Sequence, residues 1–259
     1  MIEVHNLTFG YSATEDRQIL KGVDFAAKTG KLTALIGTNG AGKSTLLKTI
    51  MGILKGKGEI SVNGKPVSQY STKDFSSTVS YLSQDNDCKV NLSVFEVVML
   101  GRMGSMSFRV SDEDIAATQE VLERLNLQRF ASRSIMELSG GQRQLVFMAQ
   151  ALVKEPKILI LDEPTSALDL HKQFDLLTLL KNLTQENDFT TLVTLHHLDL
   201  AAMFADEIIV LKEGTVYAQG APKDIFTEAM MEDVYRVKTK IYIDDNGLPH
   251  VIPLEAIIN

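Results

Sequence analysis

The sequence predicts an α/β fold with a mainly parallel sheet, an N-terminal antiparallel β region and an inserted helical subdomain. Three observations predict it. Short, continuous apolar segments alternate with helical patterns in the C-terminal half, which is typical of parallel strands buried on both faces. The first third of the chain reads as strands separated by turns. Between these parts, residues 92–153 carry a helical pattern.

The N-terminal strands are expected at residues 2–4, 22–27, 31–36 and 58–62, and an Asn63-Gly64 turn follows the last of them. A helix is expected to begin within residues 42–44 and to run to Met51.

The helical subdomain is expected at about residues 85–155, with Ser93 and Ser111 as helix caps. An acid-rich first turn follows Ser111. The apolar stripe of that helix is expected to consist of Ile115, Val121, Leu122 and Leu125.

The C-terminal part predicts alternating strands and helices. Strands are expected at residues 158–161, 190–195 and 207–211, and helices at residues 170–187 and 198–205. Residues 241–253 alternate around a turn at 245–247 and predict a terminal hairpin within a tail of about residues 238–259. We expect one domain that spans residues 1–259.

The composition is that of an ordinary globular protein, with 44% hydrophobic and 23% charged residues. The formal net charge of −7 does not favour binding to a nucleic-acid backbone. Cys88 is the single cysteine, which excludes an intrachain disulfide and a cysteine zinc site. The N-terminus lacks the pattern of a signal peptide, and the apolar runs are too short to span a bilayer. We therefore expect a soluble subunit that reaches a membrane only through a partner.

Residues 37–44 match the pattern G-x-x-x-x-G-K-[ST] in full. They follow an expected apolar strand and precede an expected helix, which is the context that supports this pattern. Backbone N–H groups and the helix N-terminus attract phosphate oxygens, Lys43 can reach the β- and γ-phosphates, and Ser44 can offer a hydroxyl to Mg²⁺. The segment predicts a nucleoside triphosphate site.

Two acids, Asp162 and Glu163, follow the strand expected at residues 158–161. Parallel sheets place their ligands at this end of the strand. Asp162 can hold Mg²⁺, directly or through water, and Glu163 can orient or deprotonate an attacking water. Alone, the pair could simply end a strand in a polar loop, but beside the phosphate pattern it favours hydrolysis.

A second helix start is expected at Ser139-Gly140-Gly141-Gln142, where Ser139 resembles a cap and the glycines expose N–H groups. This is a second anion site without a lysine, although an ordinary serine-capped helix would show the same residues.

Together these segments resemble the motifs of ATP-binding cassette (ABC) ATPases. Residues 138–144 (LSGGQRQ) are similar to the family signature, 37–45 to Walker A, 158–164 to Walker B and 166–169 to the D-loop. Gln84 resembles the Q-loop glutamine, His196 the switch histidine, and Tyr11 the aromatic that stacks on adenine. His197 stands where many members have Asp, so which of the two imidazoles faces the phosphate is left open.

The resemblance implies a P-loop NTPase core and a head-to-tail pair, either a homodimer or a pair with a related ABC subunit. Each ATP lies between Walker A of one copy and residues 139–142 of the other. Glu163 is implied to be the base, His196 to contact the γ-phosphate, and Ser44, Gln84 and Asp162 to arrange Mg²⁺ and water. The residues implied to bind the nucleotide are Tyr11, Gly37, Thr38, Asn39, Gly40, Ala41, Gly42, Lys43, Ser44, Thr45, Ser139, Gly140, Gly141, Gln142 and Asp169, the last linking the two sites.

Residues 100–102, 196–201, 220–222 and the tail from 234 resemble importer ATPases for iron chelates. That likeness implies uptake of a siderophore or haem-like cargo through a separate integral membrane permease, gripped by residues 84–102. A substrate-binding protein would act indirectly. The subunit would lie at the cytoplasmic face of the inner membrane, held there by the permease.

Other functions stay open. The chain could serve a vitamin B12 or metal-ion importer, or an exporter, although exporters often carry a fused membrane segment. Non-transport cassettes in DNA repair or translation usually add coiled coils, zinc cysteines or a basic surface. A small-molecule P-loop kinase would not need residues 139–142 as a second anion site.

Overall fold

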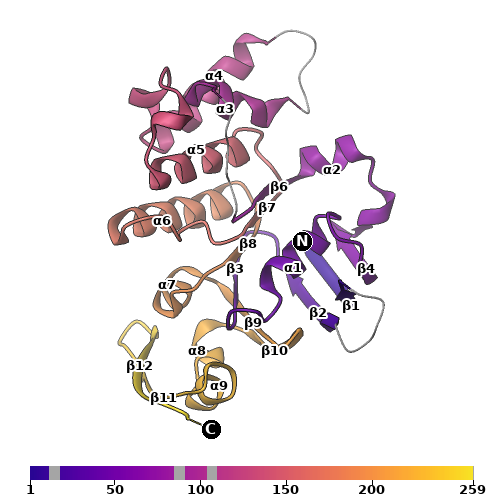
Figure 1. Ribbon diagram of the computed structural model, residues 1–259, viewed down its shortest axis with the longest axis vertical. Helices are drawn as coiled ribbons and strands as arrows, with labels where there is room; N and C mark the ends of the chain where they lie inside the picture. Colours follow the sequence, from indigo (N-terminus) through magenta and orange to yellow (C-terminus); the bar gives the residue numbers. More distant parts are fainter. Residues whose placement is uncertain (12–17, 85–90, 104–109, 259) are drawn as a thin grey trace. The chain divides into compact units, whose positions relative to one another are not determined.

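The computed structural model describes residues 1–11, 18–84, 91–103 and 110–258 (Figure 1), so Cys88 lies outside the described residues. The chain divides into two compact units: unit 1 comprises Met1–Gln69 with Leu177–Asn259, and unit 2 comprises Tyr70–Leu176. Among the described residues, no helix combines the length and apolar character needed to cross a membrane.

Unit 1 contains an antiparallel sheet in the strand order β2-β1-β4-β5. Its strands are β1 (Ile2–Gly10), β2 (Gln18–Ala27), β4 (Lys57–Val62) and β5 (Lys65–Pro66). β1 pairs antiparallel with both β2 and β4. The β4–β5 turn has positive φ at Asn63 (50°) and Gly64 (76°), as expected for an Asn-Gly hairpin turn. The predicted N-terminal antiparallel region is confirmed.

A second sheet of unit 1 is built on β3 (Lys31–Ile36), which pairs in parallel with β8 (Thr190–Thr194) and β9 (Glu207–Lys212). β10 (Thr215–Gly220) pairs antiparallel with β9. Every residue of β8 and all but the first of β3 are buried, as parallel strands covered on both faces require. The remaining elements are α1 (Lys43–Ile50), η2 (Val67–Gln69), α7 (Leu198–Phe204), α8 (Pro222–Ile225), α9 (Glu228–Met230), the π-helical turn η6 (Met231–Tyr235), β11 (Val237–Ile243) and β12 (Pro249–Ala256).

Unit 2 contains the parallel pair β6 (Val79–Leu82) and β7 (Ile158–Leu161) and a set of helices. The helices are α2 (Thr72–Thr78), α3 (Val94–Met99), η3 (Leu100–Arg102), α4 (Asp112–Arg124), η4 (Gln128–Phe130), η5 (Ile135–Glu137) and α5 (Gly140–Leu152). α6 (Leu170–Glu186) begins in unit 2 and ends in unit 1.

The predicted caps Ser93 and Ser111 are confirmed, and each forms a reciprocal capping box with the residue three positions later. The apolar stripe expected for α4 is wrong in one position. Ile115 is 37% exposed, whereas Asp114 and Thr118 lie on the buried face with Leu122.

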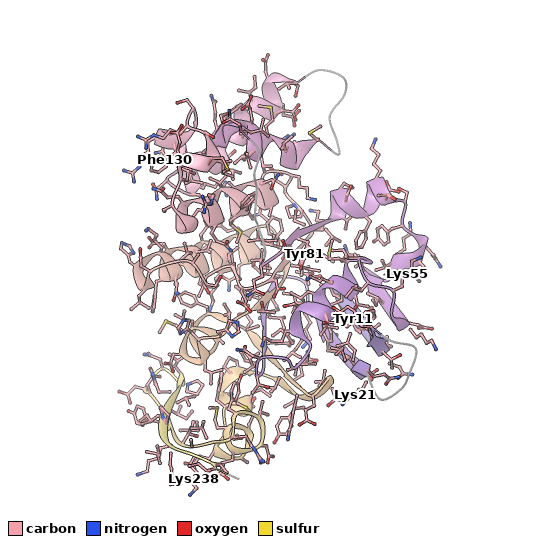
Figure 2. The ribbon with its side chains drawn as sticks, in the orientation of Figure 1. Tyr11, Lys21, Lys55, Tyr81, Phe130 and Lys238 are labelled. Carbon is pink, nitrogen blue, oxygen red and sulfur yellow. The ribbon has the colours of Figure 1, made fainter. Side chains whose placement is uncertain are left out.

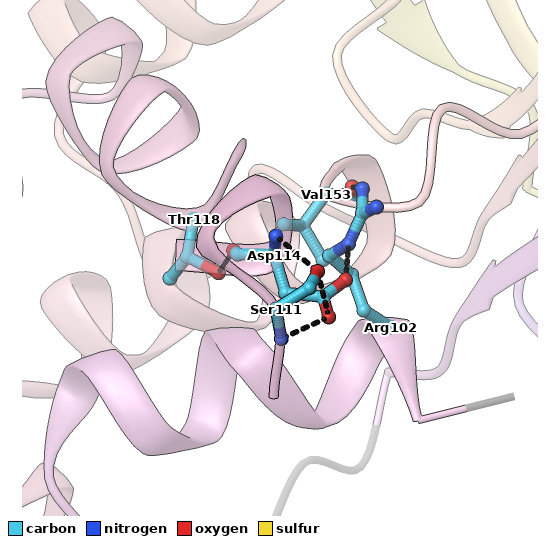
Figure 3. Close-up of polar contacts among 5 residues, drawn as sticks. All are labelled: Arg102, Ser111, Asp114, Thr118 and Val153. Atoms are coloured by element: carbon cyan, nitrogen blue, oxygen red, sulfur yellow. Dashed lines mark hydrogen bonds and ion pairs between the residues drawn. The ribbon is translucent and has the colours of Figure 1, made fainter. Parts of the chain in front are cut away.

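The carboxylate of Asp114 can be buried because hydrogen bonds from Arg102 and Ser111 satisfy both of its oxygens (Figure 3). Arg102 Nε donates to its carboxylate at 2.6 Å, and the Ser111 N–H and hydroxyl donate at 3.0 and 2.7 Å. Arg102 also donates to the Val153 carbonyl at 3.1 Å. The Arg102 hydrogen bond, followed by those from Ser111, lowers the pKa of Asp114 to about 2. This ion pair fixes α4 to η3 and to the end of α5.

Candidate functional site

The glycine-rich loop of unit 1 connects β3 to α1. Gly37, Gly40 and Gly42 have φ values of 147°, 81° and 103°, a region in which glycine is favoured. Gly42 is the N-cap of α1 and provides no side-chain cap, so the first N–H groups of the helix lie at the loop. Lys43 is 7% exposed, and its ammonium donates to the carbonyls of Gly37 (2.7 Å) and Thr38 (3.1 Å).

The loop backbone is accessible on one side and packed against the protein on the other. A Cβ atom on Gly40 would meet nothing within 4 Å, whereas a Cβ on Gly37 would lie 2.2 Å from the Leu211 carbonyl oxygen. The loop backbone is therefore pressed against β9 at Gly37 and accessible at Gly40. This is the form of a cradle for an anion, as the sequence predicts.

The two acids of unit 2 lie at the carboxyl end of β7. The Asp162 N–H donates to the Leu82 carbonyl at 2.9 Å, which continues the pairing with β6. Asp162 is 1% exposed. One strand over, the Gln84 amide Nε2 donates to Glu163 Oε2 at 2.7 Å. The parallel pairing of β6 and β7 thus brings two of the predicted catalytic residues into direct contact.

Glu163 has an unusual backbone for a side-chain-bearing residue, with φ of 51°. The next turn closes on it, because the Ser166 hydroxyl donates to its carbonyl at 3.0 Å. Residues held in this region are strained and tend to occur at functional positions. This backbone conformation ends β7 and begins the turn that follows it.

Ser139 caps α5 in a reciprocal capping box with Gln142. The Gln142 N–H donates to Ser139 Oγ at 3.3 Å, and the Ser139 N–H donates to Gln142 Oε1 at 2.9 Å. A Cβ on Gly140 would meet nothing within 4 Å, but a Cβ on Gly141 would lie 2.9 Å from the Ala167 carbonyl oxygen. The helix start predicted from LSGGQ is confirmed, and it packs against the segment before Asp169.

That segment is held by Gln173, which the sequence did not single out. Gln173 is buried, and its amide donates to the carbonyls of Thr165 (3.1 Å) and Leu168 (3.0 Å). Asp169 is exposed and accepts from the Lys172 ammonium at 2.8 Å, and hydrogen bonds from the side chain and backbone of Lys172 lower the pKa of Asp169. A single glutamine in the first turn of a helix shows no pattern in the sequence that would reveal these hydrogen bonds.

The two remaining predicted residues belong to unit 1. Tyr11 is 70% exposed and packs edge-on against Phe9 with ring centroids 5.0 Å apart (Figure 2). His196 and His197 are both exposed between β8 and α7, and His197 is the N-cap residue of α7. Exposure alone therefore does not choose between the two imidazoles.

Unit 2 also contains a cavity of about 450 Å³ between β6, η3 and α5. Tyr81, labelled in Figure 2, lies on its wall three residues before Gln84. Leu100 and Phe147 contribute apolar surface, and Arg102 and Lys154 contribute cations. The Lys154 ammonium donates to the Ser76 and Val79 carbonyls, and burial lowers its pKa.

Comparison with known proteins decides the family. The family described as ABC transporter matches residues 20–166. The chain belongs to the ABC transporter family. The iron(3+)-hydroxamate import ATP-binding protein FhuC of Bacillus subtilis is 37% identical to this ABC protein over 246 residues, which cover 94% of this chain and 90% of FhuC.

Two solved structures resemble this ABC protein. A metal-chelate type ABC transporter in an inward-facing conformation aligns with a TM-score of 0.82 and 29% identity, covering 98% of this chain and 97% of that one. A dimeric ATP-binding cassette captured after hydrolysis, with ADP and Pi bound, aligns with a TM-score of 0.78 and 30% identity, covering 86% of this chain and 99% of that one. The predicted fold and ATPase activity are confirmed: the chain is an ABC ATPase that binds ATP.

Proposed function

We propose that this ABC ATPase energises the import of an iron chelate, of the siderophore or haem type, through a separate membrane permease. The likeness to FhuC over nearly the whole chain supports this cargo class, as does the likeness to a metal-chelate type transporter. On this proposal the subunit works at the cytoplasmic face of the membrane, where its permease holds it.

The observation that carries the hydrolytic part of the proposal is the hydrogen bond between Gln84 and Glu163, directly after the buried Asp162. The amide nitrogen fixes one carboxylate oxygen of Glu163, so the other oxygen is held in a defined orientation to accept a proton from water. We assign Glu163 as the general base and Gln84 as the residue that orients it. His196 is assigned to the γ-phosphate.

The phosphate-binding role falls to residues 37–45 of unit 1, with the open face at Gly40 as the entry for phosphate oxygens. We assign Tyr11 to the adenine ring, because an exposed aromatic offers a face for stacking.

Mg²⁺ is assigned to Ser44, Gln84 and Asp162. Among the described residues no group of three His, Cys, Asp or Glu side chains is arranged to hold a metal. A hydroxyl, an amide oxygen and one carboxylate are nevertheless hard oxygen donors, which suit Mg²⁺ when phosphate and water supply its other ligands. When bound, the ion would neutralise charge on the phosphates.

We further propose that two copies pair head to tail and that Ser139, Gly140, Gly141 and Gln142 of one copy complete the nucleotide site of the other, with Asp169 between the sites. The capped start of α5 presents helix N–H groups at the accessible Gly140, which is chemistry for a phosphate. The known dimeric cassette with ADP and Pi supports this pairing.

The permease is proposed to dock in the cavity of unit 2. The cavity combines apolar surface from Leu100 and Phe147 with polar lining residues such as Ser80 and Gln150, so it suits a short amphipathic helix. Tyr81 in the cavity wall lies three residues before Gln84 in the chain. A permease helix bound in the cavity would therefore contact the strand that precedes the residue orienting Glu163.

Two experiments test the proposal. Glu163→Gln is expected to bind MgATP and to lose almost all hydrolysis, and full turnover would remove Glu163 as the base. In cells that lack the gene, uptake of radiolabelled ferric hydroxamate and haem is expected to fall, with cobalamin uptake as the comparison. Loss of cobalamin uptake alone would contradict the iron-chelate assignment.

A further inference from the structure

The turn between β9 and β10 lies against the phosphate-binding loop. The Gly214 N–H donates to the Ala41 carbonyl at 3.1 Å, and the Gly214 carbonyl accepts from the Lys21 N–H at 2.8 Å. Ala41 belongs to the loop and Lys21 to β2, and β10 runs beside β2 (Figure 1). One glycine therefore bridges the loop and the strand through its own backbone.

No other residue fits at this position. Gly214 has φ of 84°, and a Cβ there would lie 2.0 Å from the Ile19 carbonyl oxygen. Rigid backbone rather than a flexible side chain occupies this space. Any side chain at position 214 must push the turn away from β2, and it would carry the Ala41 contact with it.

The same loop is braced from β9 and from η6. A Cβ on Gly37 would lie 2.2 Å from the Leu211 carbonyl oxygen, three residues before Gly214. The Gly37 backbone also hydrogen-bonds to the Tyr235 hydroxyl, and burial raises the pKa of that hydroxyl. η6 itself is tied to β10, because the Tyr217 hydroxyl donates to Asp233 at 2.7 Å.

We propose that Gly214 and Tyr235 are positioning residues that hold the phosphate-binding loop in its binding shape and so set the affinity for nucleotide. Both lie outside residues 20–166, the part that defines the family match. A loop held in shape before the ligand arrives loses less conformational freedom on binding, which raises affinity. The inference rests on the proposed role of residues 37–45 in binding phosphate.

The test is the Kd for MgADP, measured by calorimetry on the full chain, with the melting temperature of the nucleotide-free protein measured alongside. Gly214→Ala is compared with Gly64→Ala, which has a similar φ of 76° but nothing within 4 Å of its Cβ. We expect Gly214→Ala to weaken MgADP binding roughly tenfold or more, and Gly64→Ala to change it less than about twofold. Equal affinities for the two variants would overturn the proposal.

Tyr235→Phe keeps the ring and removes only the hydroxyl, so it decides the question if Gly214→Ala does not fold. We expect its Kd for MgADP and its KM for ATP to rise about 3- to 10-fold with kcat at saturating ATP unchanged, and Tyr242→Phe, at an exposed position, to change neither. A fall in melting temperature without any change in Kd would show a merely structural role and overturn the proposal.

Lys43→Ala separates this inference from the proposed site. If Lys43→Ala keeps full affinity for MgADP, the loop does not bind the phosphates. The proposed positioning role of Gly214 and Tyr235 is then refuted as well. If Lys43→Ala loses MgADP binding while Gly214→Ala and Tyr235→Phe match the wild-type Kd, only the positioning role of Gly214 and Tyr235 is refuted.

Discussion

Ser139 is expected to act twice, as the cap of its own helix and as a ligand for nucleotide bound to a second copy, and the chain provides controls that separate the two roles. Ser93, Ser111 and Ser139 each form a reciprocal capping box, with N–H to Oγ distances of 3.2, 3.2 and 3.3 Å. Replacing each with alanine removes this bond, and at Ser93 and Ser111 it also removes a 2.7 Å hydrogen bond from the hydroxyl to the carboxylate of Glu96 or Asp114.

The loss of stability is therefore expected to be at least as large at Ser93 and Ser111 as at Ser139. Serine-to-alanine changes at N-caps cost about 1 kcal/mol, which lowers the melting temperature by about 2–4 °C in a chain of this size. A hydrogen bond to a charged phosphate contributes about 1.5–3 kcal/mol more, so only Ser139→Ala should also lose roughly 10- to 100-fold in kcat.

The assay is steady-state ATP hydrolysis by the purified subunit, with thermal melts of the same three variants. The expected result is a loss of kcat confined to Ser139→Ala, with losses of stability in Ser93→Ala and Ser111→Ala at least as large as in Ser139→Ala. If Ser93→Ala or Ser111→Ala reduces kcat as much as Ser139→Ala, then Ser139 acts only as a helix cap. The assignment of residues 139–142 to the nucleotide of the partner copy is then wrong.

Three further predictions concern unit 2. Gln84→Ala loses the 2.7 Å bond to Glu163 and should lower kcat about tenfold or more; an unaltered kcat would contradict the orienting role. Asp114→Asn should lower the urea midpoint at neutral pH. This difference in urea midpoint should shrink as the pH falls from the ordinary pKa of 3.8 towards about 2. The lowered pKa of Asp114 in the folded protein adds stability only at pH values where the carboxyl of the unfolded chain is ionised. A difference that does not depend on pH would argue against the ion pair. Gly101→Ala should destabilise the fold strongly, because its Cβ would lie 2.2 Å from the Gln150 carbonyl oxygen, whereas Gly140→Ala meets nothing within 4 Å; equal melting temperatures would refute this reading of the η3–α5 contact.

Local sequence predicted the fold wherever one pattern dominated. A continuous apolar run identified β7, and serine caps identified the starts of α3, α4 and α5. β6 and β10 were not predicted. The polar Ser80 interrupts the short apolar run of β6, and β10 alternates between intermediate and exposed residues.

The motif residues could be predicted because each motif is a contiguous run with its own chemistry. What the sequence could not provide were contacts between distant segments. The error at Ile115 arose because Asp114, an acid, takes a buried place when Arg102 pairs with it, and no helical pattern encodes a partner 12 residues away. Gly214 was missed for the same reason, because it contacts the backbone of a loop distant in the sequence. Gln173 was missed because nothing in the sequence shows that its amide bonds to the carbonyls of the turn just before its helix.

Two copies of this ATPase are proposed to close on ATP. Sedimentation of Glu163→Gln with MgATP tests it most directly, because bound ATP then persists. We expect a species of twice the chain's mass with MgATP, and a single chain without nucleotide or when Ser139→Arg is added to Glu163→Gln. A protein that stays a single chain at saturating MgATP, or pairs equally well with Ser139→Arg, would contradict it.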